Sequence, residues 1–266
     1  MVNPNGNIEI IEHPYRGKDG KTKFNDLYVA GIDSVDQGQL DSTTSKNRSS
    51  LAMLVKKRMV DGEYFSQTSN IYVAKYIGRS LDVRDDYEES LKLALYYNAK
   101  VNIEYTRIGI IHYYREKKQW KLFMKRPAIA RSNAGSADLE YIKRLREQTL
   151  IGTTTTPVVI DHQDGKIKEY TRDFCHQIYF TDLLEQLRDY QREDRTKYDL
   201  VVAMGLCEIA DEDLMSIPAK ESNLPSKELK KFGYYIDHRG VKRFGELPES
   251  GNIRNHIKTN TPYDVR

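Results

Sequence analysis

The sequence predicts an α/β fold in which a central mixed β-sheet is flanked by helices. The first half of the chain carries compact apolar runs bounded by polar and turn-forming residues, which is the pattern of buried strands. The clearest run is Leu27 to Ile32, which ends at Asp33. Further along, apolar residues recur at helical spacing, as at Tyr87, Leu91 and Leu95. The 266 residues fit one large domain, or one domain with extensions.

The expected strands cover 8–11, 27–32, 49–59, 71–77 and 100–105, with 121–127 as a further short candidate. The run at 8–11 is expected at a sheet edge. Between the strands at 49–59 and 71–77, Val60-Asp61-Gly62-Glu63 contains the Asp-Gly pair typical of a hairpin turn. The strands at 27–32, 49–59 and 71–77 are therefore expected to form an antiparallel meander.

The expected helices cover 85–98, 108–116, 139–147, 166–176, 181–190 and 198–210. Thr181 is a candidate N-cap for its helix. The helix at 198–210 is apolar nearly all round, so it should be deeply buried. Residues 34–47 and 153–156 are expected to be loops, because they consist largely of polar residues.

Composition divides the chain into three parts and excludes several classes of protein. Residues 1–26 are a turn-rich extension, 27–215 form the folded domain, and 216–266 are a polar extension interrupted by prolines. No apolar run approaches the roughly 20 residues of a membrane span. The net charge of +3 permits nucleic-acid binding without establishing it. Cys175 and Cys207 are expected to be small buried residues in a reducing compartment rather than a disulfide.

Motifs of other enzyme classes are missing from the sequence. The six histidines have no metal-ligand spacing, and there is no Cys-x-x-Cys pair, Ser-His-Asp order or glycine-rich dinucleotide loop. These absences argue against a zinc site, a hydrolase triad and a dinucleotide-binding domain.

Three acidic residues stand in apolar surroundings. Asp33 ends the first apolar strand, Glu104 lies within Val101-Asn102-Ile103-Glu104-Tyr105, and Asp199 opens the most apolar helix. A buried carboxylate is costly unless it is paired or binds a cation. Carboxylate oxygens are ligands that select Mg²⁺ or Mn²⁺, and two such ions can catalyse the cleavage of a phosphodiester. Asp36, just past the first strand, is a further candidate metal ligand.

Each acid also has a plain structural interpretation. Asp33 can be a turn residue, Glu104 can lie on the polar face of an edge strand, Asp199 can be a helix N-cap, and Asp36 can be a solvated loop acid. The order of a strand-end Asp, a later strand Glu and a late-helix Asp favours a shared metal site.

Clusters of basic residues are candidates for DNA contacts, because lysine and arginine neutralise phosphates. The candidates are Lys56, Lys57, Arg58, Lys117, Lys118 and Lys121. For any one of them, a solvated charged face is the alternative.

Several segments together resemble the C-terminal nuclease domain of the tailed-bacteriophage terminase large subunit. They are Tyr28-Val-Ala-Gly-Ile-Asp33, Ile71-Tyr-Val-Ala-Lys-Tyr-Ile-Gly78, Tyr96-Tyr-Asn-Ala-Lys-Val-Asn-Ile-Glu104, Leu150-Ile-Gly-Thr-Thr-Thr-Thr156, the helix at 176–190 and Lys197-Tyr-Asp-Leu-Val-Val-Ala-Met-Gly-Leu206. The likeness runs from about residue 27 to 213. No single segment is highly specific, but all of them occur in the family's order.

The resemblance implies an RNase H-like fold and an endonuclease that cleaves concatemeric double-stranded DNA during viral genome packaging in the host cell cytoplasm. It places Asp33, Glu104 and Asp199 at the catalytic, metal-binding positions for two Mg or Mn ions. It suggests the portal, the small terminase and a terminase ATPase domain as partners, with no membrane association.

Two departures from the family pattern stand out. Tyr198-Asp199 occupies the place where the family often has two aspartates, and no phosphate-binding Gly-x-x-x-x-Gly-Lys-[Ser/Thr] loop of an ATPase is present. The chain is therefore expected to be a nuclease domain without a motor. A junction resolvase type of RNase H-like nuclease and a non-catalytic docking module for a portal or motor remain as alternatives.

Overall fold

The computed structural model describes residues 6–17, 26–36, 50–59, 69–130, 150–215, 232–236 and 242–246. The chain divides into two compact units, Met1–Ser222 and Asn223–Arg266. In the second unit, strands β6 (Phe232–Ile236) and β7 (Lys242–Glu246) pair antiparallel. The sequence did not predict this hairpin, because prolines and polar residues surround its two strands.

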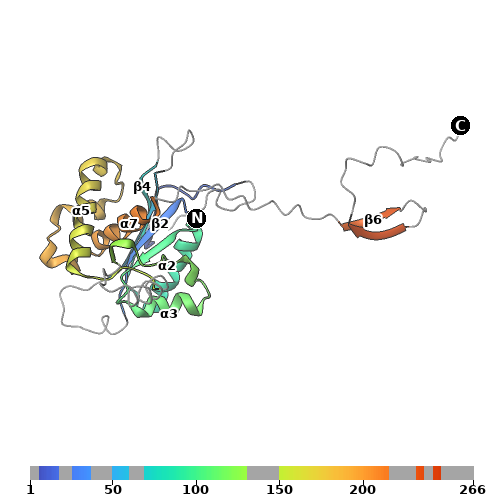
Figure 1. The fold of residues 1–266 in the computed structure, drawn as a ribbon, viewed down its shortest axis with the longest axis horizontal. Helices are drawn as coiled ribbons and strands as arrows, with labels where there is room; N and C mark the ends of the chain where they lie inside the picture. The colour runs from blue at the N-terminus through green and yellow to red at the C-terminus, as the bar shows by residue number, and fades with distance from the viewer. Residues whose placement is uncertain are drawn as a thin grey trace, which may run out of the picture. The chain divides into compact units, whose positions relative to one another are not determined.

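The first unit contains a five-stranded mixed sheet in the order β1-β4-β3-β2-β5 (Figure 1). The strands are β1 (Ile8–Ile10), β2 (Tyr28–Asp33), β3 (Leu51–Lys57), β4 (Ile71–Gly78) and β5 (Lys100–Ile103). Strands β2, β3 and β4 form the predicted antiparallel meander, β1 pairs antiparallel with β4 at the edge, and β5 runs parallel to β2. The central mixed sheet with flanking helices confirms the predicted α/β class.

Helices cover both faces of this sheet (Figure 1). They are α2 (Val83–Tyr97), α3 (Ile108–Glu116), α5 (Pro157–Phe174), α6 (Thr181–Asp189) and α7 (Asp199–Met215). Short 3-10 turns lie at η1 (Trp120–Leu122), η2 (Ala128–Ala130), η3 (Cys175–Gln177) and η4 (Arg192–Lys197). Among the described residues, no helix is both long and apolar enough to cross a lipid bilayer.

Alternation along the strands gives the sheet two apolar faces, because successive side chains point to opposite sides. In β2, Tyr28, Ala30 and Ile32 pack with residues of α2 and α3 in one core cluster. Val29 packs instead with residues of α5, α6 and α7 in a second cluster. Because a layer of helices covers each face, β3 is buried along its whole length and β4 at every residue but Ile77.

Several expectations differ from the structure. Residues 121–127 form a 3-10 turn followed by isolated bridges at Phe123 and Lys125, not a strand. Helix α5 begins at Pro157, well before residue 166, with Thr156 as its N-cap. Phe180, not Thr181, occupies the N-cap of α6. The predicted turn at 60–63 and helix at 139–147 lie outside the described residues.

The cysteine prediction is half right. Both thiols are free, but Cys175 is exposed and only Cys207 is buried.

Candidate active site

Asp33 and Glu104 leave neighbouring parallel strands on the same face of the sheet. The register pairs Ile32 of β2 with Ile103 of β5, and each acid is the next residue in its chain. Alternation places Asp33 on the same side as Gly31, which lies against α7. It likewise places Glu104 on the same side as Asn102, whose amide donates to the backbone oxygen of Leu206 in α7 at 2.9 Å. Both carboxylates therefore project toward the α7 side of the sheet.

Helix α7 brings the third acid to the same place. It packs directly on β2, where a Cβ at Gly31 would lie 2.0 Å from the backbone oxygen of Ala203. Only glycine permits this approach of helix and strand. Asp199 is the first residue of α7, and its Oδ2 accepts a hydrogen bond from the backbone amide of Ser50 at 2.8 Å.

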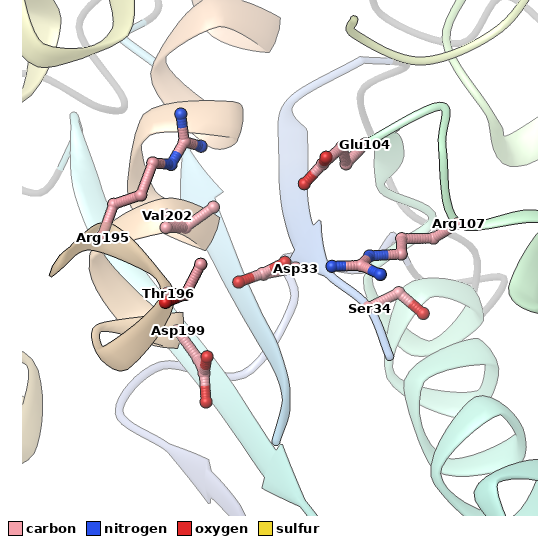
Figure 2. Close-up of a pocket in the computed structure, with 8 residues that line it drawn as sticks. All are labelled: Asp33, Ser34, Glu104, Arg107, Arg195, Thr196, Asp199 and Val202. Atoms are coloured by element: carbon pink, nitrogen blue, oxygen red, sulfur yellow. The ribbon is translucent and has the colours of Figure 1, made fainter. Parts of the chain in front are cut away.

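The three acids line one pocket (Figure 2). In this view the side chain of Asp33 lies between those of Asp199 and Glu104. The remaining lining residues are Ser34, Arg107, Arg195, Thr196 and Val202. Residues far apart in the sequence thus meet at the carboxyl ends of two parallel strands and the start of a buried helix.

The environment of the two aspartates shifts both pKa values upward, toward the neutral carboxyl forms, when no cation is present. Burial, then the charges of Asp199 and Glu104, raise the pKa of Asp33 well above its usual range, against the opposing effect of Arg107 and Arg195. Burial also raises the pKa of Asp199 to about 6, although the Ser50 amide and Arg79 act in the opposite direction. A bound cation would relieve this repulsion and desolvation.

Two hydroxyl groups orient Glu104. Thr106 Oγ1 donates to Glu104 Oε1 at 2.8 Å, and Thr155 Oγ1 donates to the same oxygen at 2.5 Å. Thr155 belongs to the segment that the sequence predicted to be a loop.

The donor set suits a hard divalent cation, because it consists of carboxylate oxygens. No three acidic, histidine or cysteine side chains in the described part of the chain are already gathered closely enough to enclose an ion. A bound cation would draw these carboxylates together, because it would neutralise their charge. Asp33, Glu104 and Asp199 therefore fit a metal site in chemistry and position, with side-chain adjustment required on loading.

Asp36 is not brought to this pocket. Its Oδ1 accepts a hydrogen bond from the backbone amide of Gly109 at 3.1 Å and lies 3.4 Å from the hydroxyl of Tyr87. Gly109 is in the first turn of α3, so Asp36 satisfies a free amide at that helix start. This contact argues against Asp36 as a metal ligand.

The basic segment at 56–58 is structural, contrary to the predicted DNA contacts. Lys56, Lys57 and Arg58 are all buried. Lys56 Nζ lies 2.7 Å from Glu208 Oε2 and 2.8 Å from Asp211 Oδ2, and Arg58 Nε donates to Asp211 Oδ1 at 2.8 Å.

Lys57 has a partner of its own, and the three other predicted lysines lie on the surface. Lys57 Nζ lies 2.6 Å from Glu12 Oε1, so it too is paired. Lys117, Lys118 and Lys121 are exposed, and Lys117 Nζ lies 3.4 Å from Glu88 Oε2. DNA binding by these three lysines remains a prediction.

Sequence reasoning missed the two arginines of the pocket, Arg107 and Arg195. Each lies a few residues from a candidate acid, Glu104 or Asp199. This closeness in sequence was the available signal, but without the fold it did not distinguish them from other arginines.

Comparisons with known proteins give little beyond the fold. No protein-family model and no curated protein matches the chain. A solved structure, described as the large terminase nuclease from thermophilic phage G20c with bound zinc, is similar at 12% identity and a TM-score of 0.41. The match covers 77% of this chain and 88% of that one. At these values no property of that nuclease is carried over to this chain.

Proposed function

We propose that the chain is a divalent-metal-dependent DNA endonuclease. The observation that supports this most strongly is the meeting of Asp33, Glu104 and Asp199 in one pocket beside two arginines. Acids from three elements are expensive to gather in this way unless cations balance them.

In this proposal Asp33, Glu104 and Asp199 would hold two Mg²⁺ or Mn²⁺ ions. Bound ions of this kind supply Lewis acidity for the attack of water on a phosphodiester and for departure of the 3′ oxygen. Asp33 lies between the other two acids in Figure 2, so its carboxylate would be the one shared by the cation site as a whole. Thr106 and Thr155 fix Oε1 of Glu104.

The biological substrate that we propose is concatemeric double-stranded DNA cut during viral genome packaging. This finer assignment is supported by the ordered sequence resemblance to terminase nuclease domains, and by the agreement of the sheet with the fold that this resemblance implies. A portal, a small terminase and a separate ATPase are partners under the same proposal.

Plasmid digestion with Mn²⁺, Mg²⁺ or EDTA tests the activity. We expect cleavage that requires the metal and falls at least about 100-fold in Asp33→Asn, Glu104→Gln and Asp199→Asn proteins, because each substitution removes an anionic ligand. Asp189→Asn is the matched control, since Asp189 is exposed on α6 and pairs with its neighbour Arg188. Undiminished cleavage by the pocket variants would overturn the proposed site.

Two other outcomes identify alternative functions. Preference for four-way junctions over linear duplex would indicate a resolvase-type nuclease. Binding to a portal ring, without cleavage in any ion, would indicate a docking module.

A further inference from the structure

Two arginines flank the carboxylates from opposite sides of the pocket (Figure 2). Arg107 precedes α3, and Arg195 lies in η4 just before α7. Arg107 Nε and Arg195 Nη1 are buried and have no hydrogen-bond partner among the described residues. A buried N–H group without a partner is unfavourable, so the hydrogen bonds of the described residues do not account for these side chains.

Neither guanidinium forms a short ion pair or hydrogen bond with a side chain of the described residues. Within the described segments, no ion pair joins Arg107 or Arg195 to a carboxylate. Arg195 Nη2 makes one long contact, 3.5 Å, to Gln163 Oε1. By contrast, the buried Arg58 pairs with Asp211 at 2.8 Å. The pocket arginines are therefore positioned to meet something other than the protein.

Arg107 is also an unfavourable N-cap residue for helix α3. It occupies the N-cap of α3 but makes no side-chain capping hydrogen bond, and Asp36 binds the amide of Gly109 instead. A positive side chain at a helix N-terminus is unfavourable, because the helix dipole is positive there. The benefit of an arginine at this position must come from the pocket.

We propose that Arg107 and Arg195 bind backbone phosphates of DNA on either side of the phosphodiester that is cut. This assignment rests on the proposed nuclease function and extends it to substrate positioning. The planar guanidinium offers two parallel N–H groups that match two oxygens of one phosphate. With anchors on opposite sides of Asp33, a strand lies across the carboxylates in a fixed direction.

The charge of the pocket gives the two kinds of residue separate roles. The carboxylates supply the oxygen ligands that a cation needs, and the guanidinium groups supply the N–H donors that a phosphate needs. Once cations are present, the arginines add direction, because an ion attracts a phosphate without fixing where its neighbours lie. The ligand that fits both arginines at once is a chain of phosphodiesters, not a mononucleotide.

The test measures DNA affinity and metal affinity separately. Fluorescence anisotropy with a short duplex in Ca²⁺ reports DNA binding, and calorimetry with Mn²⁺ alone reports the metal site. The variants are Arg107→Gln, Arg195→Gln and the corresponding lysine substitutions. Arg172→Gln is the matched control, because Arg172 is exposed on α5 and lies 2.7 Å from its neighbour Asp173.

We expect each glutamine variant to bind the duplex about 5–20-fold more weakly, with a salt slope lower by about one. Mn²⁺ binding should stay within about twofold of wild type or become tighter, and lysine should restore part of the DNA affinity. A single methylphosphonate next to the cut removes the charge of one phosphate. Wild type should bind this duplex more weakly than the unmodified one. The glutamine variant that lacks the arginine for that phosphate should bind both duplexes equally.

Wild-type DNA affinity and salt slope in both glutamine variants would overturn the proposal. A glutamine variant that fails to unfold cooperatively is replaced by its lysine counterpart, which keeps the charge but lacks the two parallel N–H groups, so it should still bind the duplex more weakly than wild type. If wild type binds DNA through these arginines but cuts it in no metal, the nuclease proposal fails and the phosphate contacts stand.

Discussion

At the scale of single residues, the pairing of a buried charge separates residues that stabilise the fold from residues of the candidate site. Lys56 and Arg58 are buried but fully matched by Glu208 and Asp211 of α7. Asp33 has no such match, because burial and then the charges of Asp199 and Glu104 raise its pKa. The sequence singled out Asp33 as a candidate site residue, which stays a prediction, and took Lys56 and Arg58 for DNA contacts although they are buried ion-pair partners. Pairing across more than a hundred residues is invisible in a sequence, because it depends on which helix covers the strand.

The threonines that hold Glu104 carry a prediction at this scale. Thr155→Val removes one of the two donors to Glu104 Oε1 while keeping the side-chain shape. Since orienting hydrogen bonds around metal ligands are worth roughly 10–100-fold in metal affinity, we expect Mn²⁺ binding to weaken about tenfold. Titration calorimetry measures this.

Thr155→Ser should bind Mn²⁺ within about twofold of wild type, because it retains the hydroxyl. Thr154→Val is the neighbouring control, as the Thr154 hydroxyl makes no hydrogen bond within the described segments. Equal affinity of the valine and serine variants at position 155 would show that this hydroxyl does not position Glu104.

At the scale of elements, the contact of β2 with α7 sets the geometry of the site. The strand ends in Asp33 and the helix begins with Asp199, so their packing fixes the separation of the two acids. The sequence predicted both elements, because one is a compact apolar run and the other is apolar all round. It could not predict their contact, which depends on the missing side chain of Gly31.

Gly31→Ala tests this contact. The added Cβ would lie 2.0 Å from the Ala203 oxygen and 2.5 Å from the Cys207 amide, both of them backbone atoms that cannot turn aside. We expect a loss of unfolding free energy of roughly 2–4 kcal/mol, because overpacking forces strand and helix apart. Urea denaturation measures the change.

Gly165→Ala is the matched control. Gly165 lies within α5 and nothing approaches its Cβ position within 4 Å, so alanine should stabilise the protein by about 0.5–1 kcal/mol. An unchanged urea midpoint for Gly31→Ala would mean that β2 and α7 tolerate separation.

Errors in the predicted elements have local causes. The helix start at Pro157 was signalled by Thr156-Pro157, a capping residue before a proline at the first helical position. The run of threonines before it indicated a loop more strongly. Residues 121–127 contact the sheet only through isolated bridges, so their apolar character reflects burial of Leu122, Phe123 and Met124 rather than a strand.

At the scale of the whole molecule, the first unit contains everything that the proposed site needs. Both core clusters and all pocket residues lie between Ile8 and Leu214. The hairpin of β6 and β7 belongs to the second unit. The sequence predicted a change of character after residue 215 but not the hairpin.

A chain ending at Ser222 should therefore fold on its own. We expect its melting temperature to stay within about 2 °C of the full chain, because no described core residue is removed, and its stabilisation by Mn²⁺ to be retained. Differential scanning fluorimetry with and without Mn²⁺ measures both. A chain ending at Tyr198 is the opposing control, since it loses all of α7, including buried Leu200, Met204 and Asp199 of the pocket. Loss of cooperative melting in the Ser222 chain would show that the second unit contributes to the fold of the first.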